Sequence, residues 1–148
     1  MTMKKLILFS FLACAFTCFL AAQNKKQQPA AGTAAKASID RGKTVYTTYC
    51  IACHQADGNG VPNLNPPLTQ TSYVLGDKKK LVGIVLKGMN EEVEINGNYF
   101  SNNMPPQQFL KDQEIADVLT YVRNNFTNKA SAVTVAEVTA TRKALGIK

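Results

Sequence analysis

The short run Cys50-Ile51-Ala52-Cys53-His54 constrains this chain more than any other stretch of its sequence. Two thiols separated by two residues and followed at once by an imidazole are typical of a site where haem is bonded to protein. Each thiol can add across one haem vinyl group, and the adjacent imidazole can then coordinate the iron from one face. A fold built around this run must leave room for a porphyrin, so the prosthetic group replaces part of the core.

Two other interpretations of the Cys-x-x-Cys pair are a zinc site and a thioredoxin-like dithiol. Structural zinc takes about four ligands, and His54 is the only histidine of the chain. The other cysteines, Cys14 and Cys18, lie in a predicted export signal and could not complete the set. A dithiol site would follow a strand within a βαβ pattern, whereas the residues before Cys50 favour a helix. The pattern therefore favours haem attachment.

Residues 1–22 have the pattern of a secretory signal peptide. A basic start is followed by the apolar run Leu6–Phe19 and then by small residues, so we expect cleavage after Ala22. An uncleaved anchor that would hold the protein at a membrane is a second interpretation, since the run approaches the roughly 20 residues of a span. Acylation of Cys18 or Cys14 is a third. Export predicts a periplasmic location or one on the outer face of the cytoplasmic membrane.

Residues 23–37 are rich in Gln, Ala and Lys without a hydrophobic period, and they predict a flexible linker before one domain over residues 38–148. The formal net charge of +7 is concentrated ahead of that domain. From Ser38 onward there are twelve basic and ten acidic side chains, hence a net charge of +2. Because nucleic-acid binding needs a basic patch on the fold itself, we expect no nucleic-acid partner.

The first half of the domain predicts two helices separated by a loop. Ser38–Tyr49 places its apolar side chains on one helical face, with Ser38 as the cap, and leads directly into the attachment motif. The stretch 55–71 is rich in Gly, Pro and Asn and predicts an irregular loop around the prosthetic group. Asp77 is placed to cap the second helix and Gly88 to end it.

The second half predicts a short hairpin over residues 91–100 and two more helices. Asp112–Phe126 has one apolar stripe at three- and four-residue steps, and residues 134–146 open with a capping box. We expect Tyr46 of the first helix to pack against the stripe around Tyr121. The prediction is an all-α fold of helices packed around one haem.

The second face of the iron needs a ligand other than histidine. After removal of the signal only Met89 and Met104 offer a thioether. Met104 precedes Pro105 and Pro106, which fix backbone angles and stiffen the loop, whereas Met89 follows the helix-ending glycine without such bracing. We expect Met104 to be the ligand; a core-filling methionine is the ordinary alternative.

Together these features resemble class I cytochrome c, a small helical fold with the attachment motif near the front and a ligating Met-Pro late. The positions that match are Gly42, Tyr46, Cys50, Cys53, His54, Gly58, Gly60, Pro66, Pro67, Leu68, Met104, Pro105 and Tyr121. The resemblance implies that Cys50 and Cys53 attach one haem c covalently. It implies that His54 is the proximal ligand of the iron and Met104 the distal one. A carbonyl of the Pro66-Pro67 stretch should accept the imidazole N–H.

The same resemblance implies a one-electron carrier rather than an enzyme, a monomer that moves electrons between a redox protein donor and an acceptor. The tail over residues 133–142 is also similar to cytochrome domains associated with copper nitrite reductases and quinoprotein dehydrogenases. Two alternatives stay open: a cytochrome subunit of a larger oxidoreductase, and a haem enzyme or gas sensor whose open distal site could use Asn102 and Asn103 as donors. Lysines 78–80 are either a solvated face or a docking patch.

Overall fold

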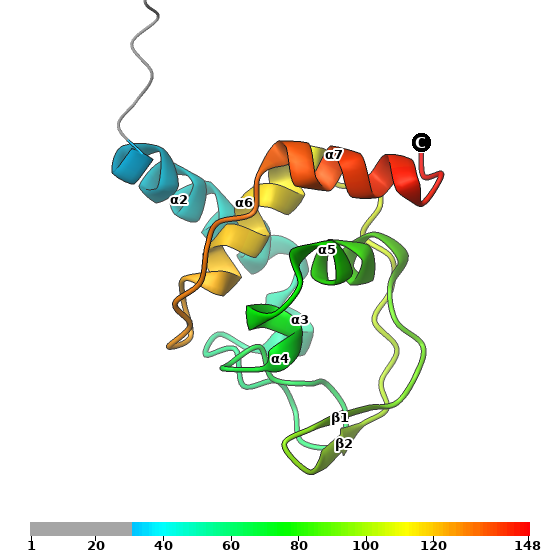
Figure 1. Ribbon diagram of the computed structural model, residues 1–148. Helices are drawn as coiled ribbons and strands as arrows, with labels where there is room; N and C mark the ends of the chain where they lie inside the picture. Colours follow the sequence, from blue (N-terminus) through cyan, green and yellow to red (C-terminus); the bar gives the residue numbers. More distant parts are fainter. Residues whose placement is uncertain (1–30) are drawn as a thin grey trace, which may run out of the picture. The chain divides into compact units, whose positions relative to one another are not determined.

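The structure is a computed structural model that describes residues 31–148. The predicted signal peptide over residues 1–22 and residues 23–30 of the predicted linker lie outside the described residues. Within residues 31–148 the elements are α2 Ala31–Tyr49, α3 Ile51–His54, α4 Ser72–Leu75, α5 Lys78–Lys87, β1 Val93–Ile95, β2 Asn98–Phe100, α6 Asp112–Arg123 and α7 Val135–Ala144 (Figure 1). This part of the chain contains no helix long and apolar enough to cross a membrane.

The first described helix, α2, begins earlier than predicted. It starts at Ala31, so residues 31–37 are helical and the prediction of a flexible linker was wrong for them. Alanine and lysine are strong helix formers, and Lys36 pairs with Asp40 one turn later at 2.8 Å. Ser38 is not a cap, because its hydroxyl donates to a carboxylate oxygen of Asp117 at 2.5 Å instead.

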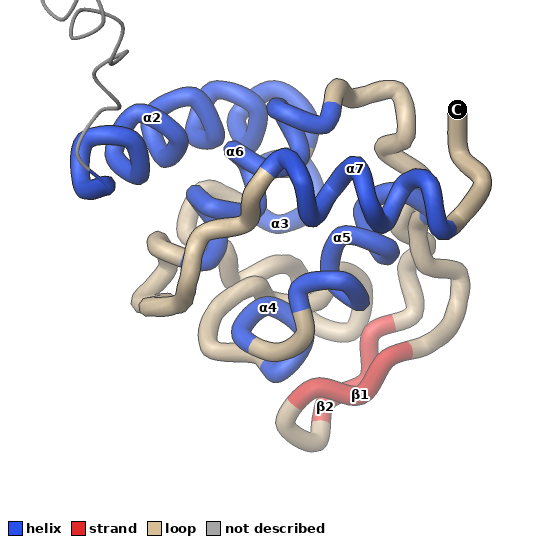
Figure 2. Tube along the Cα trace, turned by 45° about the horizontal axis from the view of Figure 1, so that its top comes forward, coloured by secondary structure: helices blue, strands red, loops and turns tan. Residues whose placement is uncertain are grey.

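Helices α2 and α6 cross in close contact (Figures 1 and 2). At the crossing a Cβ on Gly42 would overlap the main-chain carbonyl of Asp117, so only glycine allows the two backbones to approach this closely. Beside it, the Tyr46 ring lies 5.4 Å from that of Tyr121 and 5.2 Å from that of Phe126, centroid to centroid. The predicted packing of Tyr46 against the α6 stripe is confirmed, and it ties residues far apart in sequence.

A buried carboxylate strengthens the same crossing. Asp117 is only 2% exposed, and its oxygens accept hydrogen bonds from the Arg41 guanidinium at 2.6 and 2.8 Å. The Gln113 amide donates to it at 3.0 Å. A buried charge is costly unless it is paired and hydrogen-bonded, and here both conditions are met. The network therefore holds α2 and α6 at one relative position.

Helix ends elsewhere follow the predicted signals, with one exception. The Asp77 carboxylate accepts from the Lys80 amide at 2.6 Å, which caps α5, and Gly88 ends that helix with a φ of 74°. The predicted capping box at the start of α7 is present. Helix α6 instead stops at Arg123, because Phe126 adopts a left-handed φ of 52° that no helix can continue.

The apolar side chains of the described residues form two clusters. The larger one joins α2, α4, α5, α6 and α7. The smaller one, which we call the hairpin cluster, consists of Val93, Ile95 and Phe100 with Tyr73 and Met89 packed against it. Its strands confirm the predicted hairpin, with Val93 opposite Phe100, and it is the one exception to the all-α expectation in this range. Figure 2 shows the hairpin at the end of the domain away from α2.

Candidate functional site

A hollow separates the two clusters and reaches the surface. It holds about 1270 Å³ of space not filled by protein, its mouth included. Side chains from α2, α4, α5 and α6 and from segments 65–68 and 102–107 line it, and most of them are apolar. Pockets that hold small molecules and cofactors are lined in the same way, by mostly apolar side chains with a few polar groups. The described core is thus built around an apolar hollow.

The attachment motif lies at one edge of this hollow. Cys50 precedes the single turn α3, and the amides of Cys53 and His54 donate to the Cys50 carbonyl at 3.2 and 2.9 Å. Positions three and four apart share a helical face, so the turn presents all three side chains to the hollow, which they line. Both cysteines are free thiols. The geometry suits two thioether bonds and one imidazole ligand to the same group.

The ionisation of the motif argues against a redox dithiol. Burial, and then the proximity of Cys53, raise the pKa of the Cys50 thiol to about 11. Reactive dithiols have the opposite property, a lowered pKa that exposes a thiolate. The zinc alternative also lacks support, because residues 31–148 contain no cluster of three or more histidine, cysteine or carboxylate side chains that could hold a metal ion.

The His54 imidazole is oriented by the loop that follows it. Its Nδ1 lies 3.0 Å from the Pro66 carbonyl oxygen, so Nδ1 carries the proton and donates, and Nε2 keeps a lone pair for a metal. Burial lowers the pKa of His54 despite the opposing effect of this hydrogen bond, and the ring is neutral, the form that ligates. The predicted carbonyl partner is confirmed, and it is Pro66 rather than Pro67.

Two residues support this loop in ways that sequence reasoning did not identify. Gly60 has a φ of 67°, and a Cβ there would overlap the Asn65 and Pro66 carbonyls, so glycine lets the loop fold back under His54. The Tyr46 hydroxyl donates to the Gln55 carbonyl at 2.6 Å and fixes the end of α3, and burial raises its pKa. The resemblance included both positions without their roles. Only a three-dimensional contact could have revealed them.

Both methionines of the described chain reach the hollow from its other side. Met89 and Met104 pair in an isolated antiparallel bridge, in which each amide donates to the other's carbonyl at 2.9 and 2.8 Å. Met89 has no adjacent proline, as the sequence shows, but its backbone is fixed by the bridge to Met104. A Cβ on Gly88 would overlap the Met104 carbonyl, which keeps the two segments in contact.

Of the two asparagines before Met104, Asn102 is already hydrogen-bonded within the protein, unlike a side chain that is free to donate to a ligand on the iron. The Asn102 side-chain amide donates to Asn65 at 2.7 Å, and its backbone amide donates to the Leu64 carbonyl at 3.0 Å. Asn102 thereby joins the methionine segment to the loop that carries Pro66. Asn103 also lines the hollow.

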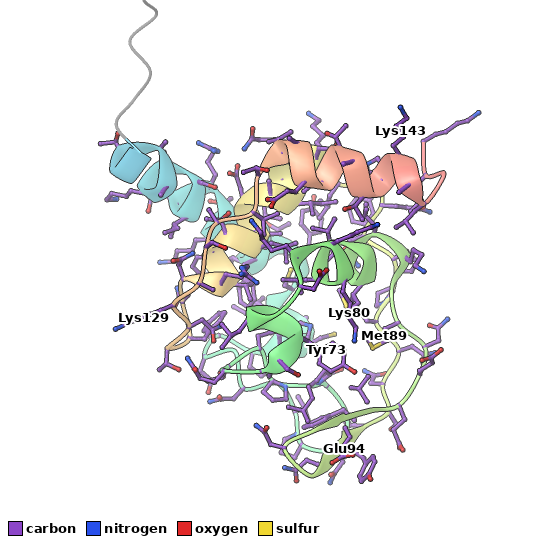
Figure 3. All side chains as sticks on the ribbon, in the orientation of Figure 1. Tyr73, Lys80, Met89, Glu94, Lys129 and Lys143 are labelled. Carbon is purple, nitrogen blue, oxygen red and sulfur yellow. The ribbon has the colours of Figure 1, made fainter. Side chains whose placement is uncertain are left out.

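The three lysines at the start of α5 do not form one uniform patch. Lys78 pairs with Glu137 of α7 at 2.5 Å and donates to the Ala132 carbonyl at 3.1 Å. The Lys80 ammonium lies 4.7 Å from the centroid of the Tyr73 ring (Figure 3). Two of the three cations thus have contacts within the domain, which gives them a structural role that the sequence alone did not indicate.

Comparisons with known proteins agree with this geometry. The family model described as Cytochrome c matches residues 39–126. Cytochrome c-552 of Thermus thermophilus is 29% identical over 129 residues, in a match that covers 72% of this chain and 98% of that protein.

Two further relatives are subunits of dehydrogenases. The cytochrome c subunit of alcohol dehydrogenase (quinone) from Gluconacetobacter polyoxogenes is 32% identical over 111 residues, which cover 68% of this chain and 22% of that subunit. The gluconate 2-dehydrogenase cytochrome c subunit of Pantoea cypripedii is 34% identical over 106 residues, covering 69% of this chain and 24% of that subunit. With the attachment motif and the hollow beside it, these matches show that the chain belongs to the cytochrome c family, whose members bind haem c covalently.

Proposed function

We propose that the protein is a one-electron carrier that works outside the cytoplasm, in the periplasm or on the outer face of the cytoplasmic membrane. Cys50 and Cys53 would hold the haem through thioether bonds. His54 and Met104 would be the two protein ligands of its iron. The observation that supports this best is the convergence of the attachment motif and a methionine on one apolar hollow.

Each side chain has a defined part in this proposal. When bound, haem supplies an iron that gains and loses a single electron. The Pro66 carbonyl holds the His54 ring in the ligating tautomer. The Met104 thioether favours ferrous iron and raises the potential, and the apolar lining acts in the same direction by disfavouring the additional charge of the ferric state. With both ligands supplied by the protein, no coordination site would be left for a substrate.

The contacts of Asn102 favour a carrier over an enzyme or gas sensor. Its side chain is used in the bond to Asn65 and its backbone in the bond to Leu64. A distal donor for bound oxygen or nitrite would have to be released from that network. The second candidate function is a cytochrome subunit of a larger oxidoreductase, which the two dehydrogenase relatives favour. Such a subunit would also transfer single electrons through the haem, but its electron donor would be a permanently bound subunit.

The test is the spectrum of the full chain, exported together with haem-attachment machinery. Mass spectrometry should show one haem added covalently, and Cys50→Ala and Cys53→Ala should each remove one thioether bond. The ferric protein should show the weak red absorption band that a methionine sulfur gives, and it should bind azide poorly. A wild-type protein that lacks this band and binds azide readily would refute the His/Met carrier.

A further inference from the structure

The two methionines of the described chain form a matched pair. In the bridge between Met89 and Met104 each residue donates to and accepts from the other, at 2.9 and 2.8 Å. Residues paired in this way have Cα atoms about 5.5 Å apart, and their side chains leave the bridge on the same side. The fold therefore places two methionines at directly opposite backbone positions, and both residues line the hollow.

The two side chains approach the hollow from different packing environments. Met104 packs against the larger core cluster, and Met89 packs against the hairpin cluster. Figure 3 shows Met89 with Tyr73 and Lys80 in the space between α5 and the hairpin. Met89 also borders a second, more open hollow on its outer side. An unbranched side chain with open space beside it can change rotamer without moving its backbone.

We propose that Met89 is a second thioether ligand of the haem iron, which takes the axial position when the Met104 sulfur is lost from it. The proposal rests on the function proposed above, because it assigns a further residue to the same iron. One iron–sulfur bond is exchanged for another, without transfer of an electron or a proton. The exchange needs only side-chain movement, because Met89 and Met104 are already paired in one backbone bridge.

The alternative role for Met89 is packing alone, and substitution separates the two roles. Leucine is close to methionine in volume and lacks the sulfur. The variants are Met104→Leu, Met89→Leu and the double variant, all in the full exported chain. Phe100→Leu in the Met104→Leu background is the matched control, because Phe100 belongs to the hairpin cluster, offers no ligand and is not among the residues that line the hollow.

Two measurements report the outcome: the red band of the ferric protein and an azide titration. Met104→Leu should retain a thioether band, shifted from the wild-type position, and the double variant should lose it. Azide should bind the double variant about tenfold more tightly than Met104→Leu if the reserve ligand leaves the iron open about a tenth of the time. The Phe100→Leu control should keep the band.

The inference is overturned if Met104→Leu lacks the band and binds azide as tightly as the double variant, while the wild type keeps the band. Loss of the band from the wild type would refute the proposed function instead, so the two failures are distinguishable. Covalent haem content, measured by mass spectrometry, verifies that each variant has matured. Met104→Ala tests the same position with different packing, and a thioether band there is again the expected result.

Discussion

The two sides of the haem hollow are built differently. On the attachment side, α2 and α3 are held by the crossing with α6, where Gly42 meets the Asp117 backbone and the Arg41 ion pair is nearby. On the methionine side, two short segments meet in a single bridge between Met89 and Met104, and a hairpin of two three-residue strands lies beyond. The first side rests on helices with many long-range contacts. The second rests on few, so exchange of a ligand is easier there.

The largest effect is expected from His54→Ala on the attachment side. Removal of the imidazole takes away the ligand that the Pro66 carbonyl orients, so the normal absorption spectrum should be lost. The Met104→Leu variant should retain covalent haem and a low-spin spectrum. Ala52→Ser is the control, because it alters the motif at an exposed position between the cysteines. Equal spectra for His54→Ala and the wild type would contradict the larger role that we assign to the attachment side.

Gly42→Ala should break the attachment side by steric overlap. A Cβ there would meet the Asp117 carbonyl and the Tyr121 side chain, and we expect a loss of about 3 kcal/mol in the free energy of unfolding. Gly83→Ala in α5 is the matched control, since nothing lies within 4 Å of its Cβ position. In a helix that exchange should stabilise by about 0.5–1 kcal/mol. Denaturant unfolding measures both, and similar values would refute the crossing argument.

Tyr46→Phe should weaken the same side without changing its packing. It removes the hydroxyl that donates to the Gln55 carbonyl at 2.6 Å, and we expect a loss of about 1 kcal/mol. Tyr49→Phe is the control, because that ring is 47% exposed. Thermal unfolding of the two variants gives the difference. A larger loss of stability for Tyr49→Phe than for Tyr46→Phe would contradict the importance of the hydrogen bond from Tyr46 to Gln55.

The smallest effect is expected from Glu137→Gln, in a contact that belongs to neither side. The hydrogen bond from Lys78 holds the pKa of Glu137 below its usual range. A carboxylate with a lowered folded pKa stabilises at neutral pH, and this contribution is lost as the pH falls through and below the ordinary value of about 4.3. For a pair this exposed the loss should be under about 1 kcal/mol. Wild type and variant should therefore converge in stability at low pH.

Local signals in the sequence predicted the parts of the fold that depend on neighbouring residues. The caps at Asp77 and Thr134 are present, as is the hairpin. The family resemblance predicted a carbonyl partner for His54 in the Pro66-Pro67 stretch, and the structure identifies it as Pro66. The loop between them has no regular structure from which that choice could be predicted.

Long-range contacts explain where the predictions failed. The Ser38 hydroxyl bonds to Asp117, 79 residues away, and so does not cap a helix. Phe126 leaves the α6 helix to pack on Tyr46. Met89 is braced by a residue on another segment, which a search for neighbouring prolines could not find. In each case the deciding partner is distant in sequence.

The raised pKa of Cys50 has a consequence for biogenesis. In the folded chain this thiol stays protonated at neutral pH, and a protonated thiol is a poor nucleophile. In an exported polypeptide that folded before haem attachment, the Cys50 thiol would therefore react poorly with the haem vinyl group. Under the proposed attachment, we therefore expect haem to be bonded more readily to the unfolded polypeptide than to the folded one.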